Sequence, residues 1–356
     1  MTLFNFTVRA TDDAGAFADR DFSIKIRNSI VDRYMTVNAT DSYTSPEGST
    51  WTQRVTYGGQ GVVHGAGKWL IPISTTQYRL SVDGINYTTH SWPQSQHVTP
   101  TVRWVNGRFV YIGNNGTNGV LVYSYDGLTW TQTAGVVKSV TNSGEGAWLK
   151  YCNIIYIDGK WYVANHQGSS LLTAVARVSA DDGATWANVT TGYTFAPTGF
   201  YHYNGLWIAL SGESTANGRV YTSNDTVVWT PRTLGTTLLY TTRIGTDLLY
   251  GNGRLVMPLH KGDGTNTTSA VNTVLTSVNG IDWTANTYAD VFVTGQTGYS
   301  GRVQAIYHNG LFMLCCNTVN GSGSIGGLRV SEDGVTWTTR NASLGALLGL
   351  SGLSQG

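Results

Sequence analysis

Charged residues are scarce in this sequence, and their scarcity limits the partners that the chain can attract. Asp, Glu, Lys and Arg make up 12% of the 356 residues, and the formal net charge is +1. A chain with so little charge has no strong field to draw in nucleic acid or an anionic membrane, so we expect neither as a partner. No run approaches the roughly 18 consecutive apolar residues of a membrane-spanning helix. We therefore expect no membrane insertion.

Cysteine is also rare. The three cysteines are Cys152, Cys315 and Cys316, and their spacing fits neither a disulfide framework nor a metal site. We interpret them as small apolar side chains of a core. The remaining potential ligands show no zinc-binding or EF-hand spacing. The sequence therefore predicts no metal and no cofactor.

The residues that are abundant favour strands. The chain holds 44 Gly, 20 Tyr and 12 Trp, and Thr, Asn and Ser are frequent. Aromatic and β-branched residues are enriched in strands, whereas the helix-forming residues Lys, Glu and Ala are few. The composition predicts an all-β protein.

One short motif occurs seven times, and we call it the box. Its fullest copy is SADDGATW (179–186), in which a Ser, an Asp-Gly turn and a Trp follow one another. Asp-Gly between two strand-like runs indicates a hairpin with a type I′ turn, whose two central residues need positive φ. The Ser and Asp side chains can accept hydrogen bonds from the amides of the turn, and the aromatic residue can anchor the next strand in the core. The seven aromatic residues that end the boxes are Trp51, Tyr87, Trp130, Trp186, Trp229, Trp283 and Trp337.

A second motif alternates with the boxes and consists of an apolar run with a tight glycine turn. Examples are WVNGRF, YIDGKW and HYNGLW, and the turn glycines are Gly67, Gly107, Gly159, Gly205, Gly253 and Gly310. Each repeat is therefore expected to hold strand A, a tight turn, strand B, a variable loop, strand C, the box turn and strand D. Four antiparallel strands per repeat are typical of the blades of a β-propeller.

The two ends of the repeat region complement each other. Residues 33–54 align with strands B, C and D of the next repeat but have no strand A, while LLGLSGL (347–353) resembles a strand A with its turn. We expect the C-terminal strand to pair with the N-terminal blade and close the ring. The sequence thus predicts a seven-bladed β-propeller over residues 33–356.

Residues 1–32 precede the repeats as a separate segment. FNFTVRA and DRDFSIKI alternate apolar and polar residues around the turn TDDAGAFA, which indicates a β-hairpin. The pair resembles the last two strands of an immunoglobulin- or cadherin-like domain of the kind found in tandem in phage and bacterial adhesion proteins. An isolated two-stranded hairpin is marginally stable in water. We therefore expect that the segment continues a longer chain, or docks on the ring or on a neighbouring subunit, and interpret it as an attachment element.

The box resembles the Asp-box, or bacterial neuraminidase repeat, of sialidases, sortilin-type receptors and many phage and bacterial surface proteins. SADDGATW fits that pattern fully, whereas the other six copies are one residue shorter or lack the Gly. The resemblance covers residues 33–353 and implies the propeller fold, but function varies among proteins of one fold. Together with the hairpin and the low charge, it leads us to predict a non-enzymatic component of a phage virion, a tail-fibre or decoration-type protein on the particle surface. A bacterial cell-surface adhesin is the nearest alternative.

A sialidase-like glycoside hydrolase is the second alternative. Such an enzyme needs three arginines that grip a carboxylate, a Tyr nucleophile paired with a Glu, and an acid Asp. Arg103, Arg243 and Arg302 come from near inner strands but stand at different depths relative to their turn glycines, and the family's Arg-Ile-Pro type motif is absent near the start. The sequence therefore favours a protein without catalytic residues.

The variable connections are the expected binding face. Strands B–C and D–A of a propeller are joined on one face, and polar loops on a rigid scaffold commonly carry binding residues. We predict that Trp92, Trp148, His166 and His260 in these connections bind a host-surface glycan. Other virion or adhesin subunits are the partners expected at the hairpin, and a homo-oligomer is a further expected assembly.

Two other histidines have a structural interpretation. His64 and His202 stand three residues before the turn glycines of their repeats, where other copies carry Trp or Tyr. A position that recurs with the repeat indicates packing. We therefore assign neither residue to a metal or catalytic site.

Overall fold

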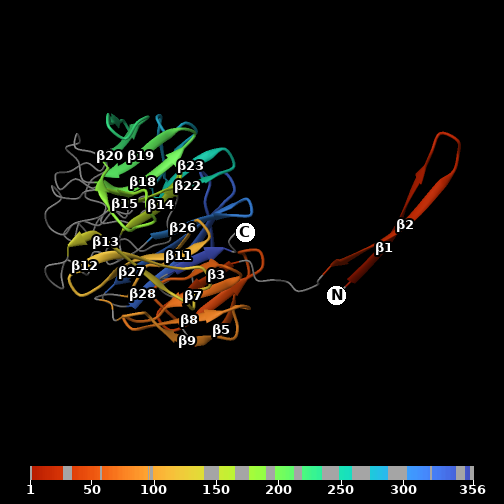
Figure 1. Ribbon diagram of the computed structural model, residues 1–356, viewed down its shortest axis with the longest axis horizontal. Helices are drawn as coiled ribbons and strands as arrows, with labels where there is room; N and C mark the ends of the chain where they lie inside the picture. The colour runs from red at the N-terminus through yellow and green to blue at the C-terminus, as the bar shows by residue number, and fades with distance from the viewer. Residues whose placement is uncertain are drawn as a thin grey trace. The chain divides into compact units, whose positions relative to one another are not determined.

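The computed structural model divides the chain into two compact units, Met1–Asp32 and Arg33–Gly356. It describes residues 2–26, 34–56, 58–94, 96, 99–139, 152–164, 176–189, 197–211, 219–234, 248–258, 273–287, 303–320, 323–341 and 349–352. Every regular element in these ranges is a β-strand (Figure 1). No helix in the described part of the chain is long and apolar enough to cross a membrane.

The first unit is a two-stranded antiparallel hairpin, as predicted. Strand β1 (Thr2–Thr11) pairs with β2 (Phe17–Ile26) over ten residue pairs. The register sets Phe4 opposite Ile24 and Phe6 opposite Phe22, so the apolar positions of the two strands coincide. The strands extend further toward the turn than the sequence pattern indicated, because Thr11 and Phe17 still pair.

The second unit is a seven-bladed β-propeller, and each blade is a four-stranded antiparallel sheet. We number the blades 1 to 7 and call their strands A to D from the centre outward. Strands A are β30 (Gly349–Gly352), β6 (Val63–Gly65), β10 (Arg103–Val105), β14 (Asn153–Ile157), β18 (Pro197–Tyr203), β22 (Leu249–Gly251) and β26 (Val303–His308). Strands B are β3 (Tyr34–Val37), β7 (Lys68–Pro72), β11 (Arg108–Asn114), β15 (Lys160–Ala164), β19 (Leu206–Ser211), β23 (Arg254–Pro258) and β27 (Leu311–Asn320).

The outer two strands of each blade follow in the same order. Strands C are β4 (Ser42–Ser45), β8 (Gln77–Ser81), β12 (Asn118–Ser124), β16 (Arg177–Ser179), β20 (Arg219–Ser223), β24 (Thr273–Ser277) and β28 (Gly323–Ser331). Strands D are β5 (Thr52–Val55), β9 (Thr88–Ser91), β13 (Thr131–Ser139), β17 (Ala187–Asn188), β21 (Thr230–Arg232), β25 (Thr284–Thr287) and β29 (Thr338–Asn341). The blade plan predicted from the two motifs is confirmed.

Ring closure occurs in blade 1, where the ends of the repeat region meet. Strand β30 pairs with β3 in the register Tyr34 to Gly352 through Val37 to Gly349. The neighbouring blades also hold β30 and β3: Ser351 Oγ accepts a hydrogen bond from His64 N (3.1 Å), and Tyr34 Oη donates to His308 O (3.1 Å). The predicted closure across the ends is confirmed.

The core of the ring lies between the blades, because each sheet packs its faces against the sheets beside it. Between blades 3 and 4, for example, Val110 and Leu121 pack with Ile154 and Trp161. Between blades 1 and 2, Met35 and Val37 pack with Trp69 and Ile71. All these side chains are buried. A blade therefore obtains its apolar contacts from its neighbours, which is why strands from two repeats make up each cluster.

The A–B turns are the type I′ turns of this fold. The residue before each turn glycine has positive φ, for example Asn106 (50°) before Gly107 (69°). Type I′ turns require positive φ at both central residues, and Asn, Asp and Gly tolerate it best. Both central residues have positive φ at the six described turns: Ala66–Gly67, Asn106–Gly107, Asp158–Gly159, Asn204–Gly205, Asn252–Gly253 and Asn309–Gly310.

The box turns are held by their own side chains, and the predicted positive φ at both central residues occurs only in the box at 179–186, at Asp182 (58°) and Gly183 (91°), whereas the other described boxes have one residue with positive φ. In blade 2 only Gly84 has positive φ, and Asp83 Oδ1 accepts from the amides of Ile85 and Asn86 (both 2.8 Å). Ser81 Oγ accepts from Gly84 N (2.7 Å) and donates to Asp83 Oδ1 (2.9 Å). The Asp therefore stabilises the turn as an acceptor, which makes positive φ at its own position unnecessary.

The aromatic residue that ends each box fixes the turn to the blade. Trp283 is buried, and the other six are half-buried, less than the sequence suggested. The indole N–H groups of Trp51, Trp229, Trp283 and Trp337 donate to the carbonyl three residues earlier (3.0 to 3.2 Å). Trp186 differs, because its Nε1 is buried without a hydrogen-bond partner.

The extra residue of the box at 179–186 explains this difference. Asp182 is the inserted residue, and its carboxylate accepts from Arg108 Nη1 (2.7 Å) and Trp161 Nε1 (2.8 Å). The carbonyl of Gly183, which stands where other boxes bind their own indole, accepts instead from Gly135 N of strand β13 (3.2 Å). The longer box therefore ties blade 4 to blade 3 by a charge-assisted bond and a backbone bond.

One box turn carries a strained residue, which generates a first prediction. Thr226 occupies the box glycine position with φ 65°, a conformation that costs an L-residue about 1–2 kcal/mol. Thr226→Gly removes that strain but adds freedom to the unfolded chain, worth about 0.4–1 kcal/mol. We expect a net gain of about 0.5–1 kcal/mol in the free energy of unfolding, measured by urea denaturation. Thr226→Ala is the control, since it retains the Cβ; an equal gain from Ala would contradict the assignment of the strain to the backbone.

Candidate functional site

The innermost strands of the seven blades surround a central channel. A cavity of about 470 Å³ in this channel is bordered by residues of β30, β6, β10, β14, β18, β22 and β26. Its wall is mainly apolar, and Arg103 is the one Lys or Arg among the lining residues that the structure describes. None of these lining residues is Asp or Glu. The channel is therefore an apolar space with a few polar groups, the general form of a ligand site.

The polar groups of the cavity come from six different blades. Asn153 is buried, and its Oδ1 accepts a hydrogen bond from Phe200 N (3.0 Å). The Nδ2 group supplies the hydrogen-bond donors of this side chain. His64 is 8% exposed. Burial and the nearby His308 imidazole lower the pKa of His64 to about 4. His64 is consequently neutral at pH 7.

One strand-A position repeats around the channel with an aromatic or imidazole ring. Its ring packs on the first large residue of strand B in the same blade, as in His64–Trp69 (4.6 Å between ring centroids) and His202–Trp207 (4.9 Å). The packing interpretation is confirmed for His64, which is buried, whereas His202 contacts Trp207 but is exposed. The position is occupied by His64, Trp104, Tyr156, His202, Tyr250 and Tyr307, and by Ser351 in blade 1.

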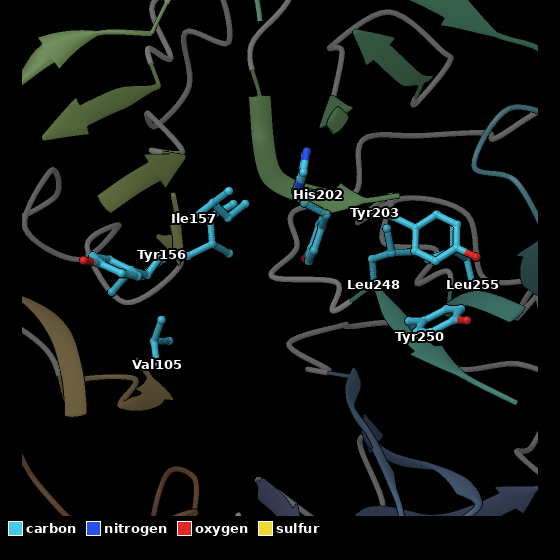
Figure 2. Close-up of a pocket in the computed structure, with 11 residues that line it drawn as sticks. Val105, Tyr156, Ile157, His202, Tyr203, Leu248, Tyr250 and Leu255 are labelled. Carbon is cyan, nitrogen blue, oxygen red and sulfur yellow. The ribbon is translucent and has the colours of Figure 1, made fainter. Parts of the chain in front are cut away.

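Beside the central cavity, a second pocket opens near the A–B turns of blades 4, 5 and 6. Its volume is about 320 Å³, at the lower end of the range of about 300–1,000 Å³ for small-ligand sites. Figure 2 shows Tyr156 and Ile157 on one side of this hollow and Tyr203 and Tyr250 on the other, with His202 between them. We call this space the mouth pocket.

The walls of the mouth pocket combine apolar surface with hydroxyl and imidazole groups. Tyr203 and Tyr250 lie with ring centroids 4.7 Å apart at 47°. A hydrogen bond shared with the Tyr250 phenol favours the neutral form and raises the pKa of Tyr203. The full lining is Val105, Ile154, Ile155, Tyr156, Ile157, Tyr201, His202, Tyr203, Leu248, Tyr250 and Leu255, which includes no Asp, Glu, Lys or Arg. A neutral ligand fits such a surface best.

The position of this pocket follows from one change in the repeat. The strand-B partner of the repeated ring is Trp69, Phe109, Trp161, Trp207 or Phe312 in blades 2, 3, 4, 5 and 7. In blade 6 the partner of Tyr250 is Leu255, which is smaller and lines the pocket. A missing aromatic ring therefore leaves the space beside Tyr250.

The glycan-binding prediction for Trp92 needs correction. Trp92 is 4% exposed, and its Nε1 donates to Ser74 O (3.1 Å). Its ring packs among Tyr78, Tyr111 and Trp130, with centroids 4.4 to 5.5 Å away. Trp92 thus anchors the D–A connection in the core and presents no face to a ligand. The other predicted ligand residues, Trp148, His166 and His260, lie outside the described residues.

The mouth pocket lies on the face opposite to the predicted one. It is bordered by the A–B turns, and A–B turns contact the boxes, for example where Lys68 Nζ donates to Asp126 O (2.8 Å). Sequence reasoning missed it because three of its rings, Tyr156, His202 and Tyr250, stand at the position that recurs with the repeat and indicates packing. The available signal was the exchange of an aromatic residue for Leu255 in the second motif, YGNGRL.

The described residues contain no metal-binding cluster. No group of three or more His, Cys, Asp or Glu in this part of the chain is placed to hold an ion. Cys152 and Cys315 are buried, and burial raises the pKa of Cys152 to about 12. Both cysteines therefore lie in the core, and the Cys152 thiol stays uncharged and unreactive at neutral pH.

Comparisons with known proteins find similar structures at low identity. No protein-family model matches the sequence, and no curated protein matches it either. One similar solved structure, "YCF48 bound to D1 peptide", shares 13% identity over 86% of this chain and 83% of that chain, with a TM-score of 0.44. Another is the Penicillium chrysogenum α-L-arabinanase complexed with arabinobiose, at 15% identity over 67% and 79% and a TM-score of 0.41. The peptide and the disaccharide are ligands of those proteins.

The buried His64 generates a pH prediction. Its pKa is lowered from 6.5 to about 4 on folding, so between these values the unfolded chain takes up a proton that the folded chain does not. The stability that His64 contributes is complete above about pH 6.5 and falls by about 3 kcal/mol as the pH drops through 4. We expect urea denaturation at about pH 7 and about pH 4.5 to reveal this loss, and His64→Gln to reduce it.

His202→Gln provides the control for this prediction. His202 occupies the equivalent position of blade 5 but is exposed to water. Its replacement removes an exposed imidazole and so controls for the loss of a histidine as such. Equal pH dependence in the original chain and in His64→Gln would contradict the assigned role of the buried imidazole.

Proposed function

We propose that this chain is a non-enzymatic component of a phage particle surface, of the tail-fibre or decoration type. Its ring binds a host-surface glycan or a neighbouring protein, and its hairpin attaches it to the particle. The observation that carries the proposal is the mouth pocket, which combines tyrosine and imidazole walls with a lining free of Asp, Glu, Lys and Arg. Such a lining holds a neutral ligand by apolar contact and hydrogen bonds.

The chemistry of the channel favours binding over hydrolysis. Glycoside hydrolases place two carboxyl groups on either side of the bond that they cleave. None of the described residues that line the central cavity or the mouth pocket carries a carboxyl group. Arg103 borders the cavity, whereas Arg243 and Arg302, the other arginines of the sialidase-like alternative, lie outside the described residues. We therefore keep the hydrolase as the less favoured candidate.

The hairpin supports the attachment role. Ten pairs join β1 to β2, and among the described residues this sheet holds two strands, so each strand has an outer edge that a third strand can join. The pairing is fixed near the turn by Arg9 and Asp19, which form a bidentate ion pair (2.7 Å for both bonds), and by Asp12 Oδ1, which accepts from the amides of Ala14 and Ala16. A hairpin with a fixed register presents the same edge to every partner. We infer that other virion subunits add to this edge; a bacterial adhesin would use the same device on a cell surface.

Removal of the hairpin tests the attachment role. Deletion of residues 1–32 should leave the ring folded, with unchanged near-ultraviolet circular dichroism and melting temperature, because the ring packs on itself. Incorporation into the parent particle, measured by co-expression and gradient sedimentation, should be lost. The control is Asp13→Ala, an exposed turn residue outside both strands, which should be incorporated normally. Normal incorporation of the truncated chain would refute the attachment role.

A further inference from the structure

We propose that the mouth pocket binds one neutral pyranose ring stacked against Tyr250. This assignment rests on the proposed binding function and names its ligand class and site. It differs from the site expected on the loops, because the mouth pocket lies among the A–B turns of blades 4, 5 and 6.

The first support is that two rings are exposed to solvent, although the fold could cover them. Seven strand-A residues are equivalent around the channel, and only His202 and Tyr250 among them are exposed. Tyr250 is 52% exposed. In blade 7, by contrast, Tyr307 lies against the backbone of Gly251 and donates to Asn252 Oδ1 (2.6 Å). The repeat can therefore accommodate a ring that is covered and hydrogen-bonded, and blades 5 and 6 depart from this arrangement.

The second support is the shape of the space. Leu255 opens room beside Tyr250, and the tilted pair of Tyr203 and Tyr250 forms a wall facing Tyr156 across the hollow (Figure 2). A volume of about 320 Å³ is small for an extended peptide or an oligosaccharide. It suits a single ring-shaped group, with the rest of a longer ligand outside the pocket.

The third support is the chemistry of the walls. A pyranose ring has a face of C–H groups, which packs on an aromatic face, and a rim of hydroxyl groups, which need partners that both donate and accept. Tyr203, Tyr250 and His202 supply aromatic faces together with hydroxyl and imidazole groups of that kind. The lining supplies no formal charge, so a charged sugar gains no ion pair. A proline or aromatic side chain of a partner protein would use the faces but leave the hydroxyl groups unbonded, which makes it the less favoured occupant.

The experiment uses the full-length chain and small neutral glycosides as probes. Methyl β-glucoside, methyl β-galactoside, N-acetylglucosamine and N-acetylgalactosamine are titrated by saturation-transfer NMR and tryptophan and tyrosine fluorescence. We expect at least one to bind with a Kd on the millimolar scale, as for a site that holds one ring, and Tyr250→Ala to weaken it about tenfold or more. Tyr250→Phe, which keeps the face and loses the hydroxyl, should fall between the two. Tyr125→Ala, a change at an exposed tyrosine outside the pocket, should bind as the original chain does.

A pocket-filling variant separates loss of binding from loss of folding. Leu255→Phe introduces the residue that blades 3 and 7 carry at this position, where Phe109 packs on Trp104 (4.8 Å between ring centroids) and Phe312 packs on Tyr307 (4.6 Å). It should leave the melting temperature within a few degrees of the original and abolish glycoside binding, because the added ring occupies the pocket. Full binding by Leu255→Phe would overturn the proposed site.

The outcomes distinguish this inference from the proposed function on which it rests. If a glycoside binds but Tyr250→Ala does not weaken it, the sugar site lies elsewhere and the mouth assignment is wrong, while the binding function stands. If no glycoside binds, but a short peptide rich in Pro and Trp binds the original chain and not Tyr250→Ala, the sugar class is wrong. If glycosides bind at Tyr250 and the hairpin proves dispensable for incorporation, the site stands and the particle role fails.

Discussion

The pairing of β30 with β3 is the constraint on which the rest of the ring depends. Each apolar cluster is built from two neighbouring blades, so a blade that lacks a neighbour exposes half of its core. A linear array of such blades would leave two apolar faces in water, and burial of these faces requires the first and last blades to meet. Four backbone pairs in blade 1, supported by bonds from Tyr34 and to Ser351, perform this task. The channel exists because the ring closes, and so does the mouth pocket.

The blade plan was predictable from the sequence because it rests on local rules that repeat. Asn-Gly and Asp-Gly pairs fix the A–B turns by their backbone preferences, and the Ser and Asp of each box satisfy the amides of their own turn. Closure was predictable because 33–54 lacked one strand and 347–353 supplied it. The turn type of the boxes was not predictable, because an Asp-Gly pair fits two turn geometries. The choice between them depends on whether the Asp side chain accepts hydrogen bonds from the amides of the turn.

The candidate binding site was far less predictable, and Trp92 illustrates the reason. A Trp in a polar connection suggests an exposed platform, yet the connection folds back so that the indole reaches Ser74 O and three aromatic rings. The mouth pocket, in turn, arises from the size of one residue, Leu255, relative to its equivalents in other blades. Such a pocket depends on differences between aligned positions of neighbouring blades, whereas a reading along the chain detects what the repeats share.

The place of β3 in its blade has a mechanical consequence. The segment that joins the two units enters the ring at β3, and β3 is hydrogen-bonded on both sides, to β30 and to β4. A tension along the axis of β3 would load the bonds of both ladders together in shear. Loading at an edge strand would instead open the bonds one after another. The attachment proposed for the hairpin would therefore load a strand that is held on both sides.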